Sequence, residues 1–110
     1  MTTIDEKWFF ERGHLHDACV TSARLDAGNV EIQFDDQWAN ERGLSKPEGE
    51  ECPLTLRFIS ATVLGGNLNE AVGGWISELR PAAEGKYSFV FTNRDVLLIQ
   101  AGSVQADCER

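Results

Sequence analysis

The sequence predicts a mainly β fold, a single compact antiparallel sandwich or open barrel of about six strands with a short N-terminal helix. Apolar and polar residues alternate along several segments, which is the period of a strand with one buried face. Short connections that contain Gly, Asn, Asp or Pro join these segments, as between consecutive antiparallel strands. A chain of 110 residues has the usual size of one domain, so we expect residues 1–110 to fold as one globular unit.

The first predicted hairpin joins residues 18–25 (ACVTSARL) to residues 30–36 (VEIQFDD) through the turn DAGN. Pairing Leu25 with Val30 places Thr21 opposite Phe34 and puts Cys19 on the same apolar face. The residues on the other face are polar. One buried and one solvated face is typical of an antiparallel sheet.

A third segment, residues 53–66 (PLTLRFISATVLGG), changes its alternation midway. Its apolar residues occupy even positions up to Phe58 and then the odd positions of Ile59, Ala61 and Val63. This switch predicts a bulge near Phe58–Ile59, or a strand that is buried on both faces beyond that point.

The C-terminal part predicts a second hairpin, in which residues 86–92 (KYSFVFT) are followed by the turn NRD and a returning strand. A three-residue loop places Phe91 opposite Leu97 and Phe89 opposite Ile99. Gly102 is expected to bend the returning strand.

Residues 67–81 (NLNEAVGGWISELRP) are compatible with two structures. Helical spacing of apolar residues, and the capping-box pattern of Asn67 with Glu70, favour a helix over residues 68–79 that covers the sheet in an α+β fold. Gly73 and Gly74 oppose this helix, because two glycines in its interior cost roughly 2 kcal/mol. We favour a loop through the glycines followed by a short strand, since strands joined by short turns lie on both sides.

The N-terminal residues 3–13 (TIDEKWFFERG) predict the short helix. Thr3 with Glu6 fits a capping box, and Gly13 supplies a stop. Ile4 and Trp8, with Phe9 as a further candidate, are expected to face the body of the domain.

Composition and charge narrow the classes of function. Apolar residues make up 42% of the chain and charged residues 25%, as in a globular protein. Eighteen acids against ten bases give a net charge of −8, and no stripe of Lys and Arg is present, so we expect no nucleic-acid binding. The apolar runs are too short to span a membrane, and we expect no membrane contact.

The cysteines and the N-terminus predict a cytoplasmic protein without disulfides. Cys19, Cys52 and Cys108 are odd in number and widely spaced, with no CxxC or CxH pair. The first residues contain acids and no long apolar run, so they do not resemble a secretory signal. We therefore expect reduced thiols.

The stretch GHLHDACV, residues 13–20, gathers potential metal ligands. In an extended chain His14 and His16 point to one face, about 6–7 Å apart, while Asp17 and Cys19 point to the opposite, buried face. Further ligands would have to come from elsewhere, and the chain has no third histidine. We favour a structural role for this stretch, and keep small-molecule or metal binding through His14 and His16 as the alternative function.

A catalytic site is not expected. A Cys–His pair is disfavoured, because Cys19 lies on the predicted apolar face and Cys52 has acidic neighbours that discourage a thiolate. The glycine pairs in LGGN and AVGGW match no phosphate-binding motif. We therefore predict neither an enzyme nor a bound cofactor.

The most acidic segment, residues 35–51, carries six acids and two bases, which is half of the net charge. We expect a solvated loop, in which Trp38 either folds back over the sheet or anchors a protein partner. Of these two positions, we favour the one in which Trp38 folds back over the sheet. The function predicted is a non-enzymatic protein-interaction domain, inhibitor- or immunity-like or self-associating, with Trp38, Glu48, Glu50 and Glu51 as contact residues.

Overall fold

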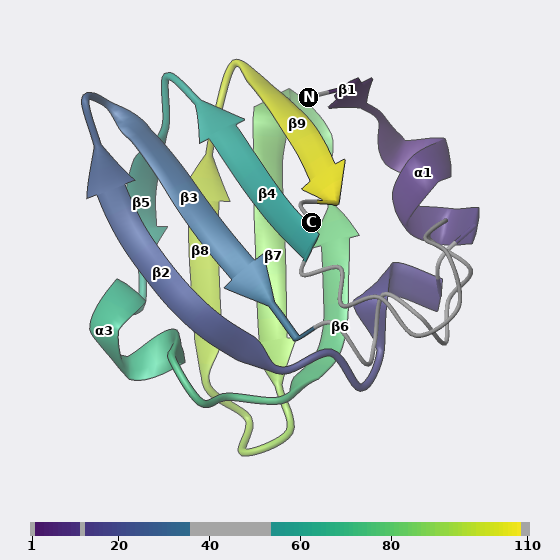
Figure 1. Cartoon of the computed structure of the whole chain (residues 1–110), viewed down its shortest axis with the longest axis vertical. Coiled ribbons are helices and arrows are strands. Elements are labelled where there is room, and N and C mark those ends of the chain that lie inside the picture. The colour runs from purple at the N-terminus through teal and green to yellow at the C-terminus, as the bar shows by residue number, and fades with distance from the viewer. Residues whose placement is uncertain (1, 12, 36–53, 109–110) are drawn as a thin grey trace.

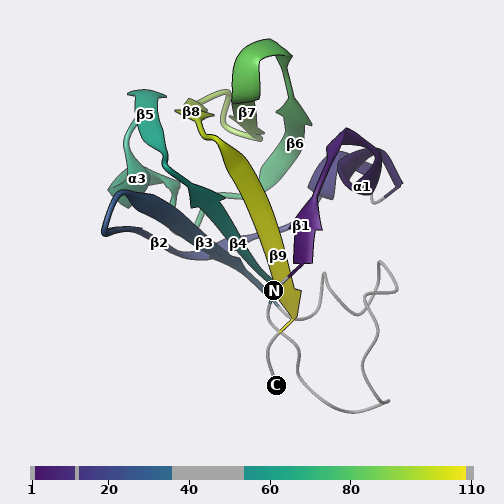
Figure 2. The ribbon, with the colours of Figure 1, turned by 90° about the horizontal axis from the view of Figure 1, so that it is seen from above.

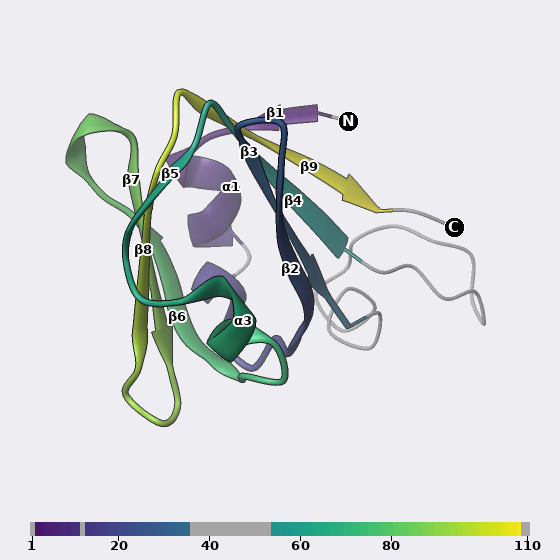
Figure 3. The ribbon, with the colours of Figure 1, turned by 90° about the vertical axis from the view of Figure 1, so that its left-hand side faces the viewer.

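The computed structural model describes residues 2–11, 13–35 and 54–108 of the chain (Figure 1). Within these residues, strands form two antiparallel sheets that lie face to face as a β-sandwich (Figure 3). The prediction of a mainly β, antiparallel sandwich is confirmed.

The first sheet contains five strands in the order β1-β9-β4-β3-β2, and the second contains four in the order β5-β8-β7-β6. The strands of the first sheet are β1 (Thr2–Ile4), β2 (Val20–Asp26), β3 (Asn29–Phe34), β4 (Leu54–Ile59) and β9 (Ser103–Cys108). Those of the second sheet are β5 (Thr62–Gly65), β6 (Ile76–Pro81), β7 (Lys86–Phe91) and β8 (Val96–Gln100).

The switch of alternation after Phe58 marks the point where the chain leaves one sheet for the other. Strand β4 ends at Ile59, Ser60 takes a left-handed φ of 52°, and β5 begins in the second sheet. Gly102 marks the reverse crossover between β8 and β9, and its amide donates a hydrogen bond to the Ile59 carbonyl at 2.8 Å. Two of the six predicted strands therefore divide between the sheets, and with β1 the described strands number nine.

The first hairpin has the predicted register near its turn and a different one farther away. Leu25 lies opposite Val30, as expected, but a bulge between Val20 and Ser22 places Val20 opposite Phe34. Val20 is buried and Thr21 is exposed. The bulge thus keeps an apolar side chain on the core, and the predicted inward position of Thr21 is wrong.

The second hairpin is shifted by two residues from the predicted register. Phe89, not Phe91, lies opposite Leu97, because the last pair of the hairpin is Val90–Val96, and residues 91–95 separate its members instead of the predicted 93–95. A shift of two residues keeps every side chain on its predicted face, and Phe89 and Leu97 both remain buried.

Residues 68–79 form a short helix and then a strand, so the favoured loop-and-strand prediction is confirmed with one addition. Helix α3 (Leu68–Ala71) is capped by Asn67, whose Oδ1 accepts a hydrogen bond from the Asn69 amide at 2.8 Å. Gly73, at φ 85°, follows the helix. A Cβ atom on Gly74 would lie 2.8 Å from the Phe91 ring, so the close packing also favours glycine there.

Helix α1 (Glu6–Glu11) and the turn η1 (Gly13–Leu15) lie beside the β6 edge (Figure 2). Phe9 is fully buried, and its ring lies 6.0 Å from that of Tyr87. A second turn, η2 (Ala83–Gly85), connects β6 to β7. None of the described helices is long and apolar enough to cross a bilayer.

Candidate interaction surface

The GHLHDACV stretch does not form the extended strand that was predicted before Cys19. Gly13, His14, Leu15 and Asp17 all have left-handed φ angles, between 54° and 72°. The two imidazoles contact different parts of the fold: His14 lies edge-on to the Phe10 ring at 6.0 Å, and His16 Nδ1 lies 2.9 Å from the Ser77 carbonyl. The stretch is a compact turn that connects α1 to β2.

Asp17 and Cys19 also differ from their predicted positions. Asp17 is exposed rather than inward, with its carboxylate 3.3 Å from His16 Nε2. Cys19 is half-buried and lies opposite Trp75 in an isolated bridge. In the described part of the chain, no three His, Cys, Asp or Glu side chains are arranged to hold a metal ion.

The environment of Cys19 favours the protonated thiol. Partial burial raises the pKa of this thiol, and the nearby Asp35 carboxylate raises it further. The same carboxylate accepts a hydrogen bond from the Cys19 amide at 3.3 Å. A nucleophile needs the thiolate, so this setting disfavours one.

The contact residues predicted in the acidic segment are Trp38, Glu48, Glu50 and Glu51. All four lie outside the described residues.

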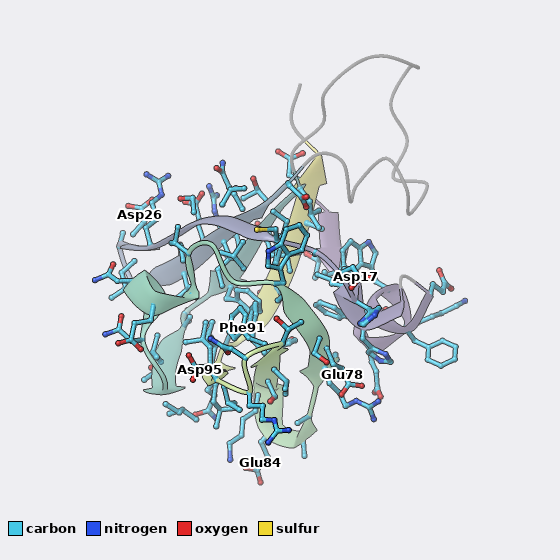
Figure 4. The ribbon with its side chains drawn as sticks, turned by 90° about the horizontal axis from the view of Figure 1, so that it is seen from below. Asp17, Asp26, Glu78, Glu84, Phe91 and Asp95 are labelled. Atoms are coloured by element: carbon cyan, nitrogen blue, oxygen red, sulfur yellow. The ribbon has the colours of Figure 1, made fainter. Side chains whose placement is uncertain are left out.

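Helix α3 lies at the open side of the sandwich and borders a cavity of about 130 Å³ beside the β7–β8 turn. Glu70 and Asp95 line this cavity, and Figure 4 places Asp95 beside Phe91 at this end of the molecule. Asn93 uses its amide within the turn, donating to the Asp95 carboxylate at 3.1 Å and accepting from the Asp95 amide at 2.9 Å. The polar groups of the turn thus stabilise the turn itself.

The outer face of the first sheet is polar. Glu31 is only 8% exposed there, and its carboxylate lies between the guanidinium groups of Arg24, at 3.4 Å, and Arg57, at 3.3 Å. Thr55 on the same face is 2% exposed, and its hydroxyl has no hydrogen-bond partner in the described structure. Side chains of the sheet itself make the charged contacts on this face.

The outer face of the second sheet carries apolar side chains on β5, β8 and β7, beside the polar Ser88 and Gln100. Leu97 and Ile99 are buried, so alternation turns Val96 and Leu98 outward. Val90 lies directly opposite Val96, and Leu64 sits in a bulge of β5 beside Leu98. We call the outward residues Leu64, Val90, Val96 and Leu98 the outer patch.

The outer patch is open to solvent. Val96 is 49% exposed and Leu64 is 46% exposed, and Val90 and Leu98 are partly exposed. No described helix or strand lies over this side of the second sheet (Figures 2 and 3).

Paired charges border the outer patch on its β6 side. Arg80 Nε donates to the Glu78 carboxylate at 2.9 Å, and Lys86 Nζ lies 3.8 Å from the Glu84 carboxylate. Two bases and two acids make this border neutral.

The outer patch was not predicted from the sequence, although the sequence contains a signal for it. Residues 96–99 read Val-Leu-Leu-Ile, an unbroken apolar run that gives both faces of a strand apolar side chains. Trp75 is another exposed apolar residue, at 52%.

Comparisons of this chain with protein-family models, with curated proteins and with solved structures found no match. The fold and surface define a small antiparallel β-sandwich with one polar and one partly apolar outer face.

Proposed function

We propose that this chain is a non-enzymatic protein-interaction domain, and that the outer patch is its contact surface. The observation that carries the proposal is the uncovered outer patch on the second sheet, in a domain whose other outer face is polar. A contiguous apolar area with a polar border is a common mark of a protein contact site.

Charge supports a protein partner over a nucleic acid. A net charge of −8 repels a phosphate backbone, and the aliphatic side chains of the outer patch offer it no hydrogen-bond donor. We place this activity in the cytoplasm, a reducing compartment, and the free thiol of Cys19 supports that assignment.

The acidic segment remains a second predicted contact. Trp38→Ala, and charge reversal at Glu48, Glu50 and Glu51, are expected to weaken partner binding if the segment contributes. Unchanged binding in both variants would remove this segment from the proposed surface. No observation favours the alternative metal or small-molecule function of His14 and His16.

A photo-crosslinking residue placed at position 98 tests the proposed function directly. Irradiation of cells of the source organism that produce this variant in place of the natural chain is expected to yield one covalent protein adduct at this position. The matched control is position 105, because Gln105 lies on the outer face of the first sheet, opposite Arg57. No adduct at position 98, or equal adducts at both positions, would contradict the proposal.

A further inference from the structure

We infer that the occupant of the outer patch is a second copy of this chain, an inference that rests on the proposed function and names its partner. In this dimer, the outer face of the second sheet of one chain would contact the same face of the other chain. Three properties of the outer patch and its border carry this inference: their charge, their symmetry and their size.

The charge pattern selects a partner whose contact surface is neutral. The border of the outer patch is neutral, because Glu78 pairs with Arg80 and Glu84 with Lys86. The other described residues carry ten acids against four bases, and Figure 4 places Asp17 and Asp26 on opposite sides of the molecule. A strongly basic partner would therefore be attracted elsewhere, whereas a second copy meets no net repulsion at this border.

Two-fold symmetry places the outer patch against its own copy. In such a contact the same residues serve both sides, so an apolar face needs no separate complementary surface. Aliphatic side chains from two sheet faces interdigitate about 10 Å apart, as they do inside a β-sandwich. The contact would thus repeat the packing that already joins the two sheets within one chain.

The size of the face predicts a weak dimer. Four strands about 4.8 Å apart and five residues of about 3.3 Å each give a face of roughly 300 Å². A stable interface buries about 800 Å² on each partner, so this contact belongs to the weak, transient class. We expect a dissociation constant on the order of 10–100 μM.

Salt dependence separates a second copy from a basic partner. Two chains of charge −8 repel one another at long range. Salt shortens the range of this repulsion, because the Debye length falls from about 30 Å at 0.01 M to about 10 Å at 0.1 M. Self-association should therefore strengthen as salt is added. Binding to a basic partner should weaken instead.

Sedimentation equilibrium of the full chain, from about 5 μM to about 1 mM at low and high salt, tests this inference. We expect a monomer–dimer equilibrium that salt strengthens. Val96→Glu should weaken the dimer at least tenfold, and Val96→Thr, which keeps the side-chain shape, should weaken it less. Leu25→Glu is the matched control, because Leu25 is 65% exposed and belongs to the other sheet.

The outcomes separate this inference from the proposed function. A chain that stays monomeric throughout, or a dimer that Val96→Glu does not weaken while thermal unfolding shows the variant to be folded, would overturn the inference. A crosslinked adduct at position 98 with a different protein would overturn it too, while supporting the proposed function. Absence of any adduct at position 98 would contradict both the inference of a second copy and the proposed function.

Discussion

The carboxylate of Glu31 lies 3.3 Å from the guanidinium of Arg57, directly across strands β3 and β4. Glu31 is 8% exposed, and Arg24 on β2 approaches the same carboxylate from the other side. A carboxylate between two guanidinium groups screens them from one another. Its removal leaves two like charges on the strands either side of position 31, with no acid between them.

Glu31→Ala is therefore expected to lower the free energy of unfolding by about 1–3 kcal/mol, because it leaves two bases without their shared acid. Glu78→Ala is the control: Glu78 is 39% exposed and pairs with one exposed arginine, so its loss should cost less than about 0.5 kcal/mol. Urea unfolding of both variants measures the difference. Equal costs would mean that the Glu31 cluster adds nothing beyond an ordinary surface pair.

Thr55→Val is expected to stabilise the domain. The Thr55 hydroxyl is buried and has no hydrogen-bond partner among the described residues. Folding therefore removes this hydroxyl from water without a compensating hydrogen bond. Valine keeps the branched shape that suits a strand, and the gain should be about 0.5–1.5 kcal/mol. Thr62→Val, at an exposed position of β5, is the control and should change little. A loss of stability at position 55 in thermal unfolding would show that the hydroxyl has a partner.

How far the sequence predicts this fold depends on the range of the interactions involved. The inward faces of β4 and β7 follow from alternation alone, since strand geometry is local. Alternation does not predict the bulge at Val20–Ser22. The bulge keeps Val20 buried in a core that strands distant in the sequence complete. The left-handed turn from Gly13 to Asp17 is equally non-local: the Asp17 amide donates to the Ile76 carbonyl at 2.9 Å, and strand β6 is far away in the sequence.

The candidate site was less predictable than the core. A continuous apolar run such as residues 96–99 indicates that both faces of a strand are apolar, but it does not say whether anything covers the second face. The outer patch arises because β8 lies between β5 and β7 and its outward side chains stay exposed, and neither property can be derived from the local sequence.

Two glycines with nearly the same backbone angle separate backbone strain from steric contact. Gly66 and Gly28 have φ angles of 85° and 82°. A Cβ on Gly66 would lie 2.5 Å from the Val96 carbonyl oxygen, whereas a Cβ on Gly28 would meet nothing within 4 Å. Gly28→Ala should cost about 1 kcal/mol from backbone strain alone, and Gly66→Ala about 3 kcal/mol once a contact with rigid backbone is added. Chemical unfolding of the two variants measures the difference in the free energy of unfolding. Equal losses would show that the backbone around Val96 moves aside without strain.

The Cys19 thiol should react slowly with iodoacetamide at neutral pH. In a Cys52→Ser, Cys108→Ser background, the midpoint of the pH–rate profile should lie above the usual thiol pKa of about 8.5, because burial and Asp35 both raise the pKa of Cys19. Asp35→Asn should lower the midpoint without restoring the usual value, since burial is the larger cause. A midpoint at or below the usual thiol pKa would contradict the effect of burial and of Asp35 on Cys19.

The same pKa shift sets the sign of a pH effect on stability. The folded state favours the protonated thiol, so the contribution of Cys19 is fully present below the unfolded pKa. It should be lost as the pH rises through the folded pKa. Thermal unfolding of the background with and without Cys19→Ser, across neutral and alkaline pH, measures this contribution.

Adjacent phenylalanines on α1 test whether this six-residue helix is held by packing. Phe9 is fully buried against Tyr87, whereas Phe10 is 71% exposed. A helix this short is unstable alone, so its docking depends on the side chain that enters the core. Phe9→Ala should lower the free energy of unfolding by about 3–5 kcal/mol, as for other large-to-small changes in a core, while Phe10→Ala, with the same chemical change, should cost less than about 0.5 kcal/mol. Urea unfolding measures both costs, and hydrogen exchange of the α1 amides should rise in Phe9→Ala alone. Similar costs at the two positions would mean that α1 does not dock through Phe9.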